Sequence, residues 1–130
     1  MNVARPFIFS TASSPVDAAA ALAALRIVRS PEGTELTATL RRHVDRLRAG
    51  HPSPIVPVVL GDEEVAMKAS HALLEQGLLV PAIRPPTVAP GTSRLRVALS
   101  AAHTGDQVDR LAAALAALPG PAGGTGVAPA

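Results

Sequence analysis

The sequence predicts an α/β fold: a three-stranded, mostly antiparallel sheet with helices packed on one face, preceded by one or two helices. Two patterns support this prediction. Residues 55–60 form a continuous apolar run bounded by turn residues, which is typical of a buried strand. From Arg94 to Leu99, arginine and alanine alternate with leucine and valine, so one face of that strand is apolar. Elsewhere leucine and valine recur at helical spacing, and helices therefore alternate with the strands.

Two helices are predicted before the first strand. Ser14 can cap the first one, Pro15 suits its first position, and the helix extends to about Arg29. Its alanine and leucine content predicts that it is largely buried. A second, amphipathic helix is predicted over residues 35–49. Its polar face is charged, and we interpret that face as solvated rather than as a surface for nucleic acid or membrane; it holds Arg41, Arg42, Asp45, Arg46 and Arg48.

The second half of the chain predicts two further helices and two further strands. Asp62 can cap a helix that ends at Gly77, and the second strand is expected at residues 78–84. A turn at residues 90–91 leads to the third strand. Thr104 and Gln107 have the spacing of a capping box, which begins a last helix ending before residue 119.

Composition excludes several classes of protein. The 130 residues are 48% hydrophobic and contain no cysteine, so disulfides and thiolate zinc sites are excluded. Aromatic residues make up 2% and the formal net charge is +2, which argues against a nucleic-acid binder. No apolar run approaches the roughly 18 residues of a membrane span. We therefore expect a soluble cytoplasmic protein with no nucleic-acid, membrane or metal partner, since its histidines also lack the spacing of metal ligands.

The stretch from Arg84 to Leu99 is the most informative for function. Arg94 and Arg96 share one strand face, and we expect a short proline-containing loop to bring Arg84 close to them. One interpretation is an ordinary solvated face of a half-buried sheet. The other is an anion site, because the planar fork of arginine binds carboxylate or phosphate in bidentate fashion. Periodicity alone does not distinguish the two.

Several segments resemble a known enzyme family. They read IRPPTV at 83–88, GTSRLR at 91–96, RPFIFST at 5–11, PVVLGD at 57–62 and LSAAHT at 99–104. In this order they resemble the α-oxoamine synthases, pyridoxal 5'-phosphate (PLP) enzymes that condense an amino acid with an acyl-CoA thioester and lose CO₂. The RPPTV form is most similar to the 8-amino-7-oxononanoate synthases of biotin synthesis. The sequence departs from the family in having Ala89 before Pro90, and in a short link over residues 50–55.

The resemblance implies a fold and a set of site residues. The fold is the small C-terminal domain of a fold type I PLP enzyme. Arg96 matches the residue that binds the α-carboxylate of the amino acid, and Arg84 matches a loop arginine that contacts a substrate carboxylate. Thr87, in the same loop, is a further substrate-binding candidate. Thr11, with Ser10 as a neighbour, matches a hydroxyl that reaches the PLP phosphate of the adjacent subunit, which implies a homodimer.

The resemblance also implies a large cofactor domain upstream of the matching segments. Lys68 is the only lysine, and it follows two glutamates on an amphipathic helix, as a solvated residue would. We therefore assign no catalytic residue and expect the chain alone to be inactive. Residues 1–13 are expected to end the large domain, 14–118 to form the small domain with its leading helices, and 119–130 to be a disordered tail. Both leading helices and the apolar strand face are expected to pack within or against the large domain and its twin.

The implied reaction is condensation of L-alanine with pimeloyl-CoA or pimeloyl-ACP to 8-amino-7-oxononanoate. Two alternatives stay open. One is another α-oxoamine synthase, of the glycine C-acetyltransferase or serine palmitoyltransferase type. The other is a non-catalytic remnant or interaction module of the same fold.

Overall fold

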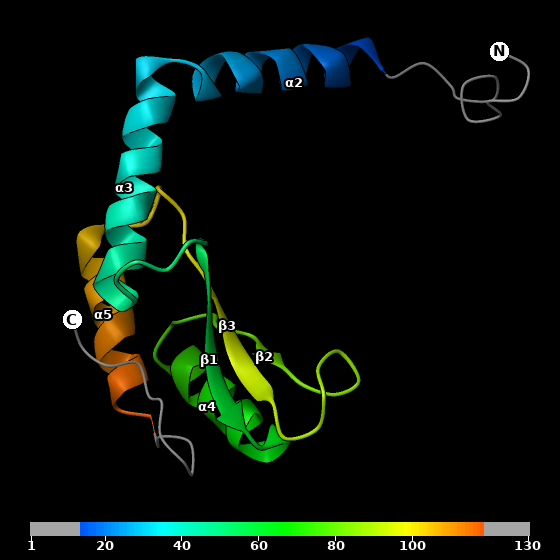
Figure 1. Ribbon diagram of the computed structural model, residues 1–130, viewed down its shortest axis with the longest axis vertical. Coiled ribbons are helices and arrows are strands. Elements are labelled where there is room, and N and C mark those ends of the chain that lie inside the picture. The colour runs from blue at the N-terminus through cyan, green and yellow to red at the C-terminus, as the bar shows by residue number, and fades with distance from the viewer. Residues whose placement is uncertain (1–13, 119–130) are drawn as a thin grey trace, which may run out of the picture. The chain divides into compact units, whose positions relative to one another are not determined.

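The computed structural model describes residues 14–118, which form four helices and three strands (Figure 1). In chain order these are α2 (Pro15–Val28), α3 (Pro31–Leu47), β1 (Ile55–Gly61), α4 (Glu63–Glu75), β2 (Ala82–Ile83), β3 (Ser93–Ala98) and α5 (Gly105–Ala116). Ser10, Thr11 and the expected C-terminal tail lie outside the described residues. The chain divides into two compact units between Leu36 and Thr37, and each unit is described by itself.

The first unit contains α2 and the start of α3. The side chain of Ser14 caps α2 by accepting a hydrogen bond from the Val16 main-chain N–H at 3.3 Å, and Pro15 follows at the first helical position. No residue of α2 is buried. The prediction of a largely buried helix is therefore wrong for the described chain. The alanine and leucine residues of α2 favour burial against another element, but no element of the described chain buries them.

The corner between α2 and α3 depends on a serine and a glycine. The Ser30 hydroxyl donates to the Ile27 carbonyl at 2.7 Å and accepts from the Gly33 N–H at 3.4 Å, so it ends one helix and begins the next. A Cβ at Gly33 would lie 2.4 Å from the Ile27 carbonyl oxygen, so the close approach of the two helices requires glycine. Because Ser30 caps it, α3 begins at Pro31, ahead of the predicted start at Glu35.

The second unit is built on an antiparallel sheet with strand order β1-β3-β2, which confirms the prediction of three mostly antiparallel strands. In this sheet Pro57 of β1 lies opposite Arg96 of β3, and Ile83 of β2 lies opposite Arg94. Strand β2 is shorter than the predicted residues 78–84. Pro81 accepts a hydrogen bond from the Arg96 N–H at 2.9 Å, but it has no N–H to donate in return.

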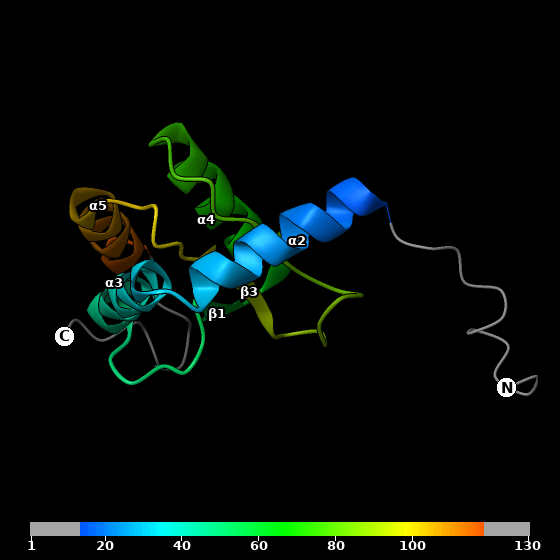
Figure 2. The ribbon, with the colours of Figure 1, turned by 90° about the horizontal axis from the view of Figure 1, so that it is seen from above.

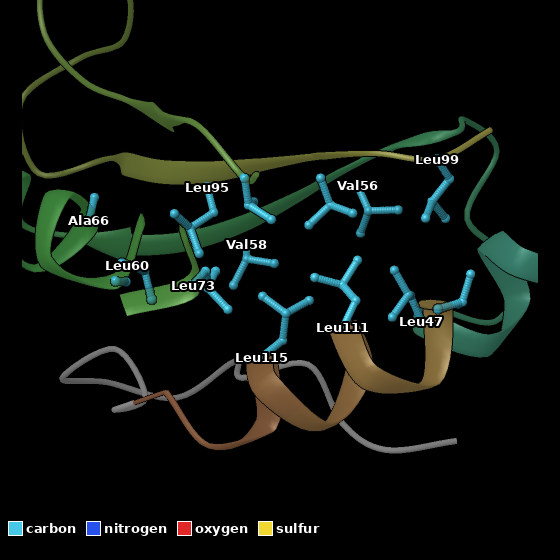
Figure 3. Close-up of a cluster of buried hydrophobic side chains, with 14 of the residues drawn as sticks. Leu47, Val56, Val58, Leu60, Ala66, Leu73, Leu95, Leu99, Leu111 and Leu115 are labelled. Atoms are coloured by element: carbon cyan, nitrogen blue, oxygen red, sulfur yellow. The ribbon is translucent and has the colours of Figure 1, made fainter. Parts of the chain in front are cut away.

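Helices cover one face of this sheet, as predicted (Figure 3). The buried side chains of β1 and β3 meet those of α4, α5 and the C-terminal half of α3. They include Leu47, Val56, Val58, Leu73, Leu95, Leu99, Leu111 and Leu115. The apolar face of β3 and the C-terminal part of the apolar stripe of α3, at Val44 and Leu47, thus belong to the core of this unit, whereas Leu36 is 44% exposed. Within the described residues, the expectation that the strand face packs against a separate domain is therefore wrong, because helices of the same chain cover it.

Caps at the helix starts and one ion pair stabilise the helices that cover the sheet. Asp62 caps α4 by accepting from the Val65 N–H at 3.0 Å, and both hydrogen bonds of the predicted capping box join Thr104 and Gln107 at the start of α5. Helices α3 and α5 lie side by side in both views (Figures 1 and 2), and Arg46 pairs with Asp109 across them at 3.5 Å.

Candidate substrate-carboxylate site

Strand β3 places Arg94 and Arg96 on the face of the sheet opposite the core. The residues that alternate with them, Leu95 and Val97, are 0% and 2% exposed, so the arginine side chains must project from the other face. On that face Arg96 is exposed and Arg94 is half-buried. Their cross-strand neighbours are apolar, since Arg96 lies opposite Pro57 and Arg94 opposite both Val59 and Ile83.

The two arginines differ in their partners. The Nε of Arg94 donates a hydrogen bond to the Thr92 carbonyl at 2.9 Å, which ties that side chain to its own turn. The guanidinium of Arg96 makes no ion pair or hydrogen bond within residues 14–118, although its main-chain N–H donates to Pro81. Arg96 therefore presents its donor fork beside apolar side chains, an arrangement suited to a planar anion such as a carboxylate.

Arg84 does not share the sheet face of Arg94 and Arg96, because its side chain is directed toward helix α4. Its Nη1 pairs with Oε1 of Glu63, in the first turn of α4, at 2.7 Å. Helix α4 packs on the core face of the sheet, whereas Arg96 projects from the opposite face. The structure therefore does not gather Arg84, Arg94 and Arg96 into one cluster. Ala82 pairs with the buried Leu95, so alternation along the chain places Arg84 on the core side of the sheet, whereas Arg94 and Arg96 share the opposite face.

Two turns shape the loop between β2 and β3. The Thr87 N–H donates to the Arg84 carbonyl at 3.0 Å, and the Pro85–Pro86 peptide bond inside this turn is cis. The predicted turn at Pro90-Gly91 is confirmed, because Gly91 has a φ of 76° and the chain closes through a 3.1 Å bond from Thr92 N–H to the Ala89 carbonyl. Thr87 is exposed between the two turns.

The remaining candidates for chemistry have structural roles. Lys68 is exposed and pairs with Glu64 one helical turn away at 3.4 Å, which confirms its interpretation as a solvated residue. His43 is buried, with its Nε2 2.9 Å from the carbonyl oxygen of His103. The Nδ1 of His103 accepts a hydrogen bond from the Ser100 N–H at 3.1 Å. These contacts hold the start of α5 against α3.

Two arginines of the predicted basic face of α3 are paired within the chain, Arg41 with Asp45 and Arg46 with Asp109. The Arg41 guanidinium donates two hydrogen bonds to the carboxylate of Asp45, and the Gly50 N–H donates a third at 3.0 Å. These bonds lower the pKa of Asp45, with the Arg41 hydrogen bond as the largest cause, and the hydrogen bond to Asp45 raises the pKa of Arg41. Residues 14–118 contain no cluster of three or more histidine or acidic side chains that could hold a metal ion. None of the helices in that range is both long enough and apolar enough to span a bilayer.

Sequence reasoning missed Glu63 as a partner of Arg84. The two residues are 21 positions apart, and no local spacing joins a helix start to the end of a later strand. The only signal in the sequence is that each residue flanks a predicted element, and that is common to many charged residues.

Comparison with known proteins identifies the family. Residues 1–115 match the model of the family described as aminotransferase class I and II. The chain belongs to this family. Among curated members, it is 47% identical over 125 residues to an 8-amino-7-oxononanoate synthase of Bordetella petrii and 54% identical over 123 residues to one of Anaeromyxobacter dehalogenans. The alignments cover 88% of this chain but 32% and 31% of those proteins, so the chain spans about a third of their length.

Solved structures agree with the sequence comparison. A serine palmitoyltransferase variant from S. paucimobilis with a bound PLP–myriocin aldimine superposes with a TM-score of 0.72 at 30% identity, over 85% of this chain and 30% of that one. The serine palmitoyltransferase of Sphingomonas wittichii gives 0.68 at 31% identity, over 86% and 31%. The family member described here thus has the fold of part of a fold type I PLP enzyme, and its resemblance to the α-oxoamine synthases is confirmed.

Proposed function

We propose that this chain is the substrate-carboxylate-binding part of a PLP-dependent acyltransferase of the 8-amino-7-oxononanoate synthase type. The reaction is condensation of L-alanine with pimeloyl-CoA or pimeloyl-ACP, with loss of CO₂. The observation that supports it most directly is the exposed guanidinium of Arg96, which lies on the sheet face opposite the core and has no ion pair or hydrogen bond within residues 14–118. The 47–54% identity to synthases of that name supports the choice of substrates.

In this proposal Arg96 binds the α-carboxylate of the amino acid. A bidentate grip fixes the orientation of the bond that breaks, so the contribution of Arg96 is one of positioning. Arg84 contacts a second carboxylate, the distal acid of the acyl chain, and Thr87 assists from the same loop. The separation of the two arginines on opposite sides of the sheet edge is compatible with binding two carboxylates that belong to different substrates.

The described residues do not by themselves fit a PLP site. Lys68 is the only lysine of the chain, and it lies on the exposed side of α4 beside Glu64. The negative charge of Glu64 beside Lys68 would repel the phosphate of the cofactor. PLP, which in such enzymes acts as an electron sink for carbanions, would be held by residues outside residues 14–118. Thr11, with Ser10, is proposed to reach the phosphate of the neighbouring subunit in a cytoplasmic homodimer.

The proposal assigns residues 14–118 to a small domain with its leading helices and residues 1–13 to the end of a large cofactor domain. The exposed apolar residues of α2 support this assignment, because a helix that is apolar around most of its surface normally packs against another element. The substrates and the dimer are properties of that longer protein, of which this chain matches about a third.

A second candidate is an acyltransferase of the serine palmitoyltransferase type. The TM-score of 0.72 to such an enzyme favours it. The two candidates differ in the acyl chain, since a palmitoyl group has no distal carboxylate for Arg84 to bind. A non-catalytic remnant of the same fold is the third candidate, and the exposed position of Lys68, which pairs with Glu64, is the observation that favours it.

A chimera tests the three candidates. Residues 5–118 would replace the matching segment of the Anaeromyxobacter dehalogenans synthase, which supplies a cofactor domain. We expect production of 8-amino-7-oxononanoate from L-alanine and pimeloyl-CoA. A chimera that uses serine and palmitoyl-CoA instead would support the second candidate. A folded, PLP-loaded chimera inactive with every pair of substrates would support the remnant.

A further inference from the structure

The Arg84 guanidinium already binds a carboxylate of its own chain. Its Nη1 lies 2.7 Å from Oε1 of Glu63, and the two side chains are 52% and 48% exposed. This ion pair joins the start of the β2–β3 loop to the first turn of α4. Within residues 14–118 it is the only ion pair of Arg84.

We propose that Glu63 occupies Arg84 in the absence of substrate and is displaced by the substrate carboxylate that Arg84 binds. The inference rests on the proposed role of Arg84. Glu63 is then a positioning residue: it holds the β2–β3 loop on α4 and sets the affinity of Arg84 for an incoming acid.

The exchange is chemically balanced. The entering group and the displaced group are both carboxylates, so Arg84 exchanges one carboxylate partner for another of the same charge. Exposed ion pairs are weak, so the pair opens readily. Once released, Glu63 stays in the first turn of α4, where the positive end of the helix stabilises its charge. An acyl chain without a distal acid cannot displace Glu63, which gives the pair a role in substrate selection.

The neighbouring residue provides a matched control. Glu64 lies one position further along the same helix turn and carries the same charge, but its partner is Lys68. Glu63→Gln and Glu64→Gln therefore remove identical charge from α4, and only the first frees Arg84. Both side chains are exposed, so both variants are expected to fold, which circular dichroism would verify.

The experiment follows the arginine side-chain ¹⁵N resonances of the 130-residue chain during titration with pimelate at constant ionic strength. The Arg84 signal is assigned by its loss in Arg84→Lys. Because exposed pairs contribute little, we expect the Kd for pimelate at Arg84 to fall about two- to fivefold in Glu63→Gln and to stay unchanged in Glu64→Gln. Glu63→Asp, which keeps the charge with a shorter reach, should give an intermediate Kd.

The outcomes separate the inference from the function on which it rests. Equal Kd values in the wild type and both glutamine variants would overturn the role of Glu63 and leave Arg84 as a carboxylate-binding residue. An equal decrease of the Kd for pimelate in both glutamine variants would show that only the net charge of α4 matters. That result would also overturn the role of Glu63. No response of Arg84 to pimelate in any variant would overturn the inference and the proposed role of Arg84 together.

Discussion

Arg94 and Arg96 stand two residues apart on one strand face, yet their side chains are bound differently. Arg94 donates to the Thr92 carbonyl, whereas Arg96 has no partner within residues 14–118. This contrast gives a prediction for the chimera. Arg96→Lys keeps the charge but loses the bidentate fork. Hydrogen bonds to charged groups contribute about 1.5–3 kcal/mol each, so kcat/KM for L-alanine should fall by roughly ten- to a hundredfold.

Arg94→Lys is the control for that prediction. It should change kcat/KM far less, because Arg94 is occupied by its own turn. Absorbance of the bound cofactor should persist in both variants, since neither arginine is proposed to hold PLP. Equal and small effects of the two substitutions would make the arginine face an ordinary solvated surface.

Asp45 gives a prediction about pH. Its pKa is lowered in the folded chain by hydrogen bonds from Arg41 and from the Gly50 N–H. A lowered pKa stabilises the fold above the unfolded value near 4, and this stabilisation is lost as pH falls through the folded value. Asp45→Asn should therefore lower the urea midpoint at pH 7, and its difference from the wild type should shrink at about pH 2. Arg41→Gln should behave likewise; a pH-independent difference in both variants would contradict the assignment.

At the scale of single elements, the capping box of α5 can be tested directly. The Thr104 hydroxyl accepts from the Gln107 N–H at 3.2 Å, and the Gln107 side chain accepts from the Thr104 N–H at 2.9 Å. Thr104→Ala leaves a first-turn N–H without its partner, so the free energy of unfolding should fall by about 0.5–2 kcal/mol. Thr104→Ser should restore most of it. Chemical denaturation of the three proteins would measure the effect, and equal stability would show that solvent caps the helix as well.

Helix α2 is the element for which the burial predicted from the sequence differs most from the structure. Leu22 and Leu25 are 49% and 51% exposed and lie one turn apart, so they form part of an apolar stripe. We expect the chain to bind a hydrophobic dye and to self-associate at high concentration, since exposed apolar patches favour association. Leu22→Gln with Leu25→Gln should reduce both effects. Leu79→Gln, at an exposed leucine in the other unit, is the control, and an equal reduction there would contradict a special role of α2.

At the scale of the whole molecule, the chain has one amine side chain that PLP could modify. Lys68 is exposed and paired with Glu64, and the hollow that it lines also contains Asp62 and Glu63, whose charges would repel the phosphate. Mixing the chain with PLP should therefore give no stoichiometric aldimine absorbance, and borohydride should trap none. The chimera, which contains a cofactor domain, is the positive control. A stoichiometric adduct at Lys68 after reduction would contradict the proposal that the cofactor is held elsewhere.

Local sequence patterns were sufficient to predict the features that depend only on neighbouring residues. The alternation in β3, the apolar run of β1 and the capping box at Thr104 need only local geometry, and each agrees with the structure. The face on which Arg96 projects also follows from alternation, because the core must take Leu95 and Val97.

The contacts that each helix and strand makes with distant parts of the chain could be read only from the tertiary structure. It shortened β2, because pairing with β3 requires donors that Pro81 lacks. It left α2 without a buried residue and enclosed Val44 and Leu47 of α3 in the core of the second unit. It also joined Arg84 to Glu63 across 21 positions, away from Arg96. Periodicity predicts which side chains are buried or charged on a given face. It does not predict which residues they contact, because those contacts join residues that are distant in the chain.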